Sequence, residues 1–309
     1  MITLSVPSQA VADAVGDLGD DVRLIIWNPA EGDAPEGAEE IQLVCLAHRT
    51  GGRTVYSRLG QLPALEAIQI PSAGFEHALP FVPHGVALCN ARGVHDTRTA
   101  EMALTLTLAS QRGLPQFFDA QRRGRWEPWE TAPSLADSRV LIVGYGSIGA
   151  AIGDRMRACE AHVEGVARSA RIAPDGTTVH AIDDILGLLP AAQIVVLVTP
   201  HDDSTDRLAN AEFLAAMPDG ALLVNVGRGA VVDTDALLAE LRAGRLRAAL
   251  DVTDPEPLPD DHPLFDAPGC IVVPHIAGFA QLTDRRYVAL VRRQVEALRR
   301  GEGPVNRVA

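Results

Sequence analysis

Three groups of chemically reactive side chains follow apolar runs in the second half of the 309-residue sequence. Arg228 lies in Asn225-Val226-Gly227-Arg228-Gly229, Glu256 in Asp251-Val252-Thr253-Asp254-Pro255-Glu256-Pro257, and His275 in Val273-Pro274-His275-Ile276-Ala277-Gly278. Ligands of open α/β sheets bind beyond the carboxyl ends of the parallel strands. If each apolar run is such a strand, the Arg, the Glu and the His converge at one edge of a sheet.

These side chains together suit the reduction of a 2-oxo acid. The planar guanidinium of Arg228 can bind a carboxylate through two hydrogen bonds. His275 can donate a proton to a carbonyl oxygen near neutral pH, and Glu256 can orient the imidazole and stabilise its charged form. Taken singly, each has a plain structural alternative, because a lone His is more often structural and an Arg after a strand often forms a surface ion pair. Their placement after neighbouring strands favours a catalytic role for all three.

A glycine-rich loop follows one of the apolar runs and could bind a second reactant. The run Val140-Leu141-Ile142-Val143 is followed by Gly144-Tyr145-Gly146-Ser147-Ile148-Gly149, a G-x-G-x-x-G pattern between a predicted strand and a predicted helix. Gly144 permits the tight turn, Gly146 allows a pyrophosphate to approach the backbone, and Gly149 allows close packing of helix on strand. The free N–H groups at the start of the helix suit phosphate oxygens. The pattern predicts a dinucleotide cofactor.

The residues after the next predicted strand favour NADP over NAD. A carboxylate at that position would accept a hydrogen bond from the ribose 2′-OH of NAD. The sequence instead reads Val166-Ala167-Arg168-Ser169-Ala170-Arg171, without an acid. Guanidinium groups bind phosphate through charge-assisted bonds, so Arg168, Ser169 and Arg171 are predicted to hold a 2′-phosphate. The alternative is that the arginines belong to a solvated loop.

The elements that position these residues form two series of predicted strands. Several runs of the second series are apolar throughout, which is typical of strands buried on both faces of a parallel sheet. The second series comprises 139–143, 162–167, 193–198, 221–226, 247–252 and 270–273. Six strands with helical crossovers predict a doubly wound dinucleotide-binding domain. The first series, which predicts a smaller α/β unit, comprises 2–6, 22–27, 41–46, 67–70 and 86–89.

Two further segments are expected to be helical. In the stretch between the series, Met102, Leu104, Leu106 and Leu108 alternate as in a strand, whereas Ala100, Ala103, Leu104 and Leu108 form a helical stripe. We expect a helix there. The second helix is expected over 283–300, with its inward positions at Val288, Val291, Val295 and Leu298.

Composition excludes several classes of protein. The net charge of −13 and the absence of a Lys/Arg run argue against a nucleic-acid partner. No apolar run reaches the roughly 20 residues that a membrane-spanning helix needs, and the sequence shows no signal peptide. None of the four cysteines has metal-ligand spacing, so no metal site is expected. We expect a cytoplasmic protein with reduced thiols.

The chain resembles the D-isomer-specific 2-hydroxyacid dehydrogenase family over nearly its whole length. The resemblance rests on the glycine loop and on five further segments. The part "DVTDPEPLP" of the fourth segment is particularly similar to glyoxylate/hydroxypyruvate reductases. These segments are "PSAGFEHAL", "CNARGVHDTRTAEMALTL", "VTPHDDSTDRLANAEFLAAMPDGALLVNVGRGAVVDTDALLAEL", "ALDVTDPEPLPDDHPLF" and "VVPHIAG". The resemblance implies NADPH- or NADH-dependent reduction of a small 2-oxo acid, such as glyoxylate or hydroxypyruvate, to the D-2-hydroxy acid by a homodimer.

The resemblance also implies an architecture of two Rossmann-like domains. A doubly wound NAD(P)-binding domain over 97–276 is inserted in a smaller, flavodoxin-like substrate domain made of 1–96 and 277–309. The helix over 98–112 connects the two and often belongs to the dimer interface.

The family's functional residues fall on positions already noted and on a few more. The catalytic Arg, Glu and His fall on Arg228, Glu256 and His275. The backbone of Ser72, Ala73 and Gly74 is implied to contact the substrate carboxylate together with Arg228. The remaining cofactor-binding positions implied are Thr199, Pro200, Thr205, Val226, Gly227 and Asp251, the last beside the nicotinamide.

The sequence departs from the family pattern at three places and leaves alternatives open. Glu160 replaces a glycine that is usual before the second strand of the nucleotide domain, the acid usual near Ala167 is missing, and Ala277 replaces a commoner Gly. Formate enzymes carry Gln at the position of Glu256, which argues against formate oxidation. Phosphoglycerate oxidation with NAD, or a corepressor-like protein that only senses the cofactor, stays open as the alternative.

Overall fold

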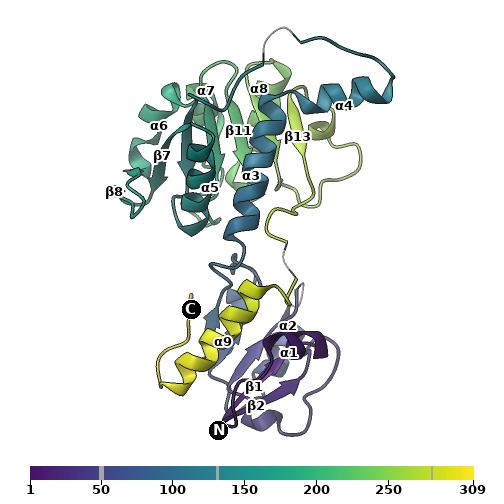
Figure 1. Cartoon of the computed structure of the whole chain (residues 1–309), viewed down its shortest axis with the longest axis vertical. Coiled ribbons are helices and arrows are strands. Elements are labelled where there is room, and N and C mark those ends of the chain that lie inside the picture. The colour runs from purple at the N-terminus through teal and green to yellow at the C-terminus, as the bar shows by residue number, and fades with distance from the viewer. Residues whose placement is uncertain (49–51, 130–131, 280) are drawn as a thin grey trace. The chain divides into compact units, whose positions relative to one another are not determined.

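The computed structural model describes residues 1–48, 52–129, 132–279 and 281–309. The chain divides into two compact units (Figure 1). Unit 1 comprises Met1–His95 and Ala280–Ala309, and unit 2 comprises Asp96–Phe279.

Unit 1 contains a five-stranded parallel sheet in the order β2-β1-β3-β4-β5. Each strand lies within a range that the sequence predicts. They are β1 (Ile2–Val6), β2 (Val22–Ile26), β3 (Leu43–Cys45), β4 (Ala67–Gln69) and β5 (Ala87–Cys89). The unit's helices are α1 (Gln9–Val15), α2 (Arg53–Leu59) and α9 (Arg285–Arg299), with 3-10 turns η1 (Ala38–Glu40) and η2 (Leu79–Phe81).

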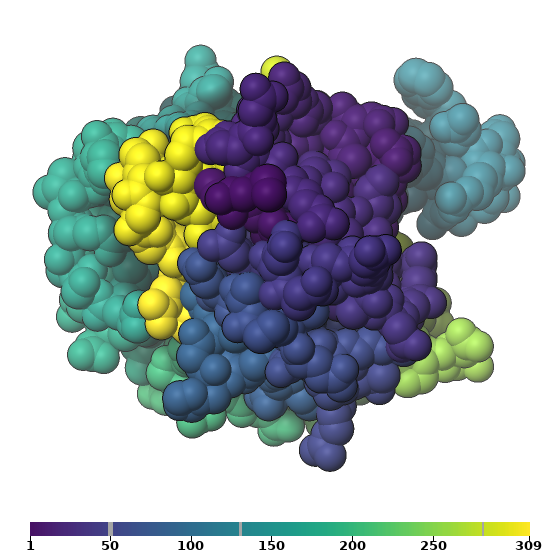
Figure 2. Space-filling view, turned by 90° about the horizontal axis from the view of Figure 1, so that it is seen from below, coloured from purple at the N-terminus to yellow at the C-terminus, as the bar shows by residue number. Residues whose placement is uncertain are grey.

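Helix α9 completes the core of unit 1 from the far end of the sequence. Tyr287, Leu290, Val291 and Val295 are buried in one cluster with Leu4 and Val6 of β1 and with Leu43 of β3. In Figure 2 the yellow C-terminal segment accordingly lies against the purple and blue N-terminal segment. The helix confirms the prediction over 283–300, although Val288 and Leu298 are only partly buried.

Unit 2 contains an eight-stranded sheet in the order β13-β12-β11-β10-β6-β7-β9-β8. Only β8 runs antiparallel to its neighbour. The strands are β6 (Arg139–Val143), β7 (His162–Ala167), β8 (Arg171–Ile172), β9 (Thr178–Ala181), β10 (Ile194–Leu197), β11 (Leu222–Asn225), β12 (Arg247–Leu250) and β13 (Cys270–Val272). The order reverses between β6 and β10, which confirms the doubly wound class. The prediction of six strands was incomplete, because it missed β8 and β9.

Helices cover both faces of this sheet and bury two separate cores. The helices of unit 2 are α3 (Asp96–Gln111), α4 (Leu114–Arg122), α5 (Ser147–Ala158), α6 (Ile185–Leu188), α7 (Ala211–Ala216) and α8 (Thr234–Arg242), with 3-10 turns η3 (Ile182–Asp184), η4 (Leu189–Ala191), η5 (Gly229–Val231) and η6 (Pro263–Phe265). Helix α3 settles the ambiguous stretch as a helix that packs against α5, β11 and β12. Ala100 and Ala103 of the predicted stripe are buried, Leu104 and Leu108 are partly buried and pack against the same core, and Leu106 is a further buried residue outside the stripe.

The register of the sheet brings the ends of its parallel strands to one level. Leu197 of β10 pairs with Val143 of β6 and with Asn225 of β11, and Asn225 pairs with Leu250 of β12. The loops that follow these strands therefore leave the sheet along one edge, and every predicted catalytic residue lies in such a loop.

The cysteines, the residue types that bind metals and the helices of the described chain have the following properties. All four cysteines are free thiols, and burial raises the pKa of Cys45 to about 12, which makes it a poor nucleophile at neutral pH. Within the ranges that the structure describes, no group of His, Cys, Asp and Glu could hold a metal ion. Across the same ranges, no helix combines the length and the apolar character needed to cross a membrane.

Candidate active site

The glycine loop joins β6 to α5 and has a distinct use for each glycine. Gly144 has a φ of +104°, and a Cβ on it would lie 2.8 Å from the backbone nitrogen of Thr199. A Cβ on Gly149 would lie 2.5 Å from the carbonyl oxygen of Gly144. These two glycines are required by packing within the protein. Gly146 is different, since a Cβ there would meet no atom within 4 Å, which leaves the open backbone that a pyrophosphate needs.

The start of α5 offers donors to an anion. Gly146 is the N-cap and provides no side-chain hydrogen bond to the first turn. The first N–H groups of a helix have no partner within the helix, so those of Ser147 and Ile148 suit phosphate oxygens, helped by the helix dipole. The loop and the first turn therefore fit the diphosphate of a dinucleotide.

The predicted 2′-phosphate site lies at the end of β7. Arg168 and Ser169 are exposed, and Arg171 opens the short strand β8. The Arg171 guanidinium donates to the carbonyl oxygen of Tyr145 at 2.5 Å, which ties it to the glycine loop. The residues predicted to hold the cofactor phosphates thus lie on adjoining loops of one unit.

Thr199 follows β10 and presents an unusual hydroxyl. Its Oγ1 is buried and has no hydrogen-bond partner, and its backbone packs against Gly144 on one side and Gly227 on the other. A buried hydroxyl without a partner costs free energy, and a bound cofactor would supply the missing partner. Pro200 and Thr205 lie in the following loop, where the Thr205 hydroxyl donates to the Pro200 carbonyl oxygen at 2.9 Å.

The loop that carries Arg228 is held by the side chain of Asn225. This residue is 1% exposed. Its Oδ1 accepts from the Gly227 N–H at 3.1 Å, and its Nδ2 donates to the Arg228 carbonyl oxygen at 2.9 Å. Arg228 is half-buried and donates to the Gly227 carbonyl oxygen at 2.7 Å. The sequence analysis quoted Asn225 without giving it a role, although a polar residue inside a buried strand end is the signal that could have revealed one.

His275 and Glu256 form the pair that the sequence predicts to transfer a proton. Nδ1 of His275 lies 2.5 Å from Oε1 of Glu256, and both side chains are partly exposed. The residues lie 19 positions apart, in the loops after β12 and β13, and the fold brings them together. Because Nδ1 faces the carboxylate, Nε2 is the ring nitrogen left to face a substrate.

Asp251 holds the backbone on which His275 stands. Its carbonyl oxygen accepts from the His275 N–H at 2.8 Å, and its carboxylate accepts from the N–H groups of Ile276 and Ala277. Burial raises the pKa of this carboxyl, and the two backbone donors partly offset the effect. The left-handed backbone of His275, with φ of +51°, is part of the same turn. Asp251 is predicted from the family resemblance to lie beside the nicotinamide, and its anchoring of the His275 backbone was not predicted.

The predicted substrate loop lies in unit 1, directly after β4. Ser72 donates through its hydroxyl to the Gly74 carbonyl oxygen at 2.7 Å, and Asn90 donates to the Ala73 carbonyl oxygen at 2.7 Å. The loop is therefore held by its own hydrogen bonds within unit 1.

A doubly wound sheet whose carboxyl edge carries an anion-binding glycine loop and an imidazole–carboxylate pair is typical of oxidoreductases that use a nicotinamide dinucleotide. The NAD-binding domain of D-isomer specific 2-hydroxyacid dehydrogenases is the family model that matches residues 104–277. The chain belongs to this family and is an NAD(P)-dependent oxidoreductase.

Named relatives and a solved structure agree with this assignment. The chain is 33% identical to a glyoxylate reductase of Thermofilum pendens over 253 residues, 78% of this chain and 74% of the relative. It is 30% identical to a glyoxylate reductase/hydroxypyruvate reductase of Homo sapiens over 293 residues, 88% of this chain and 87% of the relative. A D-isomer specific 2-hydroxyacid dehydrogenase of Xanthobacter autotrophicus Py2, solved with NADPH and MES, is 28% identical and superposes with a TM-score of 0.84, covering 100% of this chain and 98% of the other.

Proposed function

We propose that the chain reduces a small 2-oxo acid, such as glyoxylate or hydroxypyruvate, to the D-2-hydroxy acid, with NADPH as the preferred reductant. The observation that carries the proposal is the contact of 2.5 Å between His275 and Glu256, which lie with Arg228 in loops at one edge of the sheet. The similarity to the glyoxylate reductase of Thermofilum pendens and to the glyoxylate reductase/hydroxypyruvate reductase of Homo sapiens supports the choice of substrates.

Each protein group has a separate task in the reaction. The Arg228 guanidinium binds the substrate carboxylate and so orients the adjacent carbonyl. Protonated His275 donates the proton from Nε2 to the carbonyl oxygen, while Glu256 accepts from Nδ1 and stabilises the charged ring. Asn225 and Asp251 are positioning residues, because they hold the backbone of Arg228 and of His275. The reduced nicotinamide, when bound, supplies the hydride to the carbonyl carbon.

NADPH is favoured because residues 168–171, directly after β7, include two arginines and no carboxylate. Arg168 and Arg171 are the cations predicted to bind the 2′-phosphate, with the Ser169 hydroxyl as a further donor. The NADPH in the solved relative from Xanthobacter autotrophicus Py2 supports the same choice. Gly146, the first turn of α5 and the Thr199 hydroxyl would hold the rest of the dinucleotide, with Pro200, Thr205, Val226 and Gly227 lining the same edge.

Nicotinamide absorbance tests the proposed reaction. We expect absorbance decay with glyoxylate or hydroxypyruvate, faster with NADPH than with NADH. The reverse assay with 3-phosphoglycerate and NAD tests the phosphoglycerate alternative, and a faster rate there would overturn the proposed substrate. Binding of NADPH without turnover of any 2-oxo acid would favour a protein that only senses the cofactor.

We also propose that the chain forms a homodimer through the surface of α4 and the segment after it. Phe118 is 53% exposed and Trp126 is 96% exposed, and Trp129 packs against Phe117 with ring centroids 5.5 Å apart. Exposed aromatic side chains are enriched at protein interfaces. Sedimentation equilibrium should give twice the mass of 32.8 kDa for the wild type and the single mass for Trp126→Glu. A Trp126→Glu variant that stays dimeric would place the interface elsewhere.

A further inference from the structure

Tyr145, the residue between the first two glycines of the loop, has its ring enclosed in a slot made by two other glycines. The side chain is 2% exposed. A Cβ on Gly165 of β7 would lie 2.6 Å from the ring, and a Cβ on Gly153 of α5 would lie 2.6 Å from its hydroxyl oxygen. Because any larger residue at either position would displace the ring, the slot fixes where the hydroxyl points.

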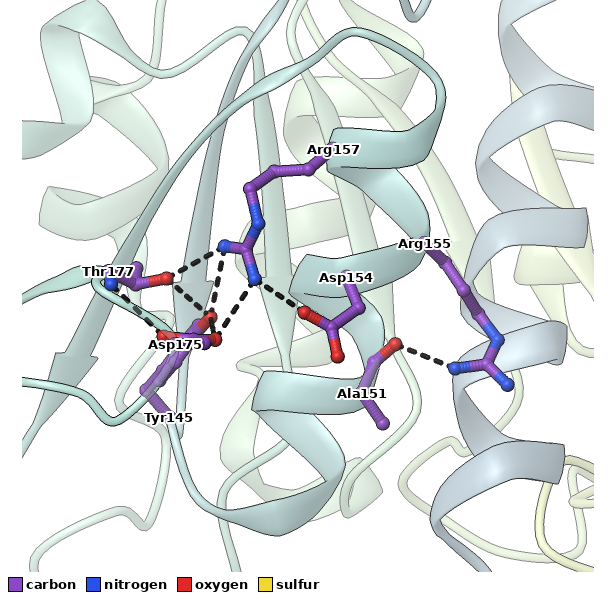
Figure 3. A network of polar contacts seen from close by, with 7 residues as sticks. All are labelled: Tyr145, Ala151, Asp154, Arg155, Arg157, Asp175 and Thr177. Carbon is purple, nitrogen blue, oxygen red and sulfur yellow. Dashed lines mark hydrogen bonds and ion pairs between the residues drawn. The ribbon is translucent and has the colours of Figure 1, made fainter.

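The hydroxyl meets a polar cluster on the turn between β8 and β9 (Figure 3). It donates to Oδ2 of Asp175 at 2.8 Å and lies 2.9 Å from Oγ1 of Thr177. Arg157 of α5 donates to Thr177 at 2.7 Å and to Asp175 at 2.9 Å, and pairs with Asp154 at 2.7 Å. The turn is therefore attached to both the glycine loop and α5.

The backbone of Tyr145 makes a second attachment to the same hairpin. Its carbonyl oxygen accepts from the Arg171 guanidinium at 2.5 Å. Arg171 pairs with Val179 across the β8–β9 ladder, and Ala173 N–H donates to the Thr177 carbonyl oxygen at 2.9 Å to close the turn. One residue thus contacts the hairpin at its start, through the backbone, and at its turn, through the hydroxyl.

We propose that Tyr145 is a positioning residue for cofactor specificity, which holds the β8–β9 hairpin and the adjoining Arg168–Arg171 loop where they meet a 2′-phosphate. The inference rests on the proposed use of NADPH. Strand β8 has only two residues, both exposed. Its hydrogen bonds to β9 alone would therefore hold Arg168 and Arg171 weakly. Fixing them in advance lowers the entropy cost of binding the phosphate. NADH has no 2′-phosphate, so the attachment contributes little to its binding.

The test compares Tyr145→Phe with a matched loss of a tyrosine hydroxyl elsewhere. Tyr56 of unit 1 has a buried hydroxyl with no hydrogen-bond partner, so Tyr56→Phe removes the same atom without removing a bond. Dissociation constants for NADPH and NADH are measured by nicotinamide fluorescence. We expect Tyr145→Phe to lower the preference for NADPH about threefold to tenfold at nearly constant NADH affinity, and Tyr56→Phe to change neither. When Arg171 is already replaced by Ala, adding Tyr145→Phe should not lower the preference for NADPH any further.

Thr177→Val offers a second route that leaves the ring slot intact. It removes the hydroxyl that contacts both Tyr145 and Arg157, and we expect the same selective loss for NADPH. Equal weakening of NADPH and NADH by Tyr145→Phe and Thr177→Val would show a purely structural role and overturn the inference. Unchanged affinities for both cofactors would overturn it as well. A wild type without preference for NADPH would instead refute the proposed cofactor, and with it the basis for this inference.

Discussion

Replacing Gly229 by alanine should disturb the active site without touching a catalytic side chain. A Cβ on this residue would lie 2.7 Å from the Asp254 nitrogen and closer still to the Thr253 carbonyl group. All of these are backbone atoms, so no side chain can rotate away. Relief requires the loop of Arg228 and the segment that leads to Glu256 to separate by at least about 1 Å, since carbon contacts lie near 3.5–4.0 Å.

The size of the effect follows from this displacement. Overpacking of a well-packed site costs about 1–3 kcal/mol. For a unit of this size that cost lowers Tm by roughly 2–12 °C, at about 2–4 °C for each kcal/mol. A misplacement of about 1 Å costs on the order of 100-fold in turnover, so kcat/KM with a 2-oxo acid should fall by about that factor.

Gly187→Ala is the matched control for this measurement. Gly187 lies in α6 of the same unit, and a Cβ there would meet nothing within 4 Å. The control should be neutral or stabilised by about 0.5–1 kcal/mol, because alanine favours a helix. Thermal unfolding and steady-state rates are measured for both variants. If Gly229→Ala matches Gly187→Ala in Tm and in kcat/KM, the close approach of the two segments is refuted.

Three further predictions concern His275, Asp175 and Glu160. His275→Ala should lower turnover about 10²- to 10⁴-fold while NADPH fluorescence shows unchanged binding, and an equal loss of binding would contradict its role as the proton donor. Burial raises the pKa of Asp175, but hydrogen bonds from Thr177, Tyr145 and Arg157 outweigh it, so the net pKa is lowered. The ionised carboxylate therefore stabilises the fold above the unfolded pKa of about 3.9, and this contribution is lost as the pH falls through the lower folded value. Asp175→Asn should be less stable than wild type at pH 7, and the gap in Tm should narrow below about pH 4; a constant gap would exclude this linkage. Glu160 has a φ of +66°, which disfavours any residue with a Cβ, so Glu160→Gly should raise the free energy of unfolding in urea by roughly 0.5–1 kcal/mol, whereas a decrease would show that the Glu160 side chain contributes more than the strain costs.

Much of the fold was predictable because unbroken apolar runs identify buried parallel strands. Strands β6 and β7 match their predicted bounds. Helical crossovers between the predicted strands indicated the doubly wound order of the sheet. The strands β8 and β9 carry no such signal, since β8 has two exposed residues and β9 alternates over only four. The stripe of α3 missed Leu106, which is buried, because the alternation of Met102, Leu104, Leu106 and Leu108 in the sequence does not show which leucine faces the core.

The candidate site was predictable to the extent that its chemistry lies in short sequence motifs. Glu256 and His275 could be paired from their strand ends, and the structure places them in contact. A polar residue at a buried strand end, such as Asn225, signals a structural role, but its partners could not be predicted, because the Asn225 and Asp251 side chains bind backbone groups of the following loops. Such contacts depend on the three-dimensional course of a loop and leave no spacing rule in the sequence.

The core of unit 1 draws on both ends of the sequence, and this sets an order for folding during synthesis. Tyr287, Leu290, Val291 and Val295 of α9 share one buried cluster with β1 and β3, so the first 95 residues leave an apolar face uncovered until the ribosome has released the last helix. Unit 2 is continuous from Asp96 to Phe279 and can close its own cores earlier. The nascent chain therefore completes unit 2 before unit 1, and the segment of unit 1 that precedes unit 2 is the part that most needs protection from aggregation.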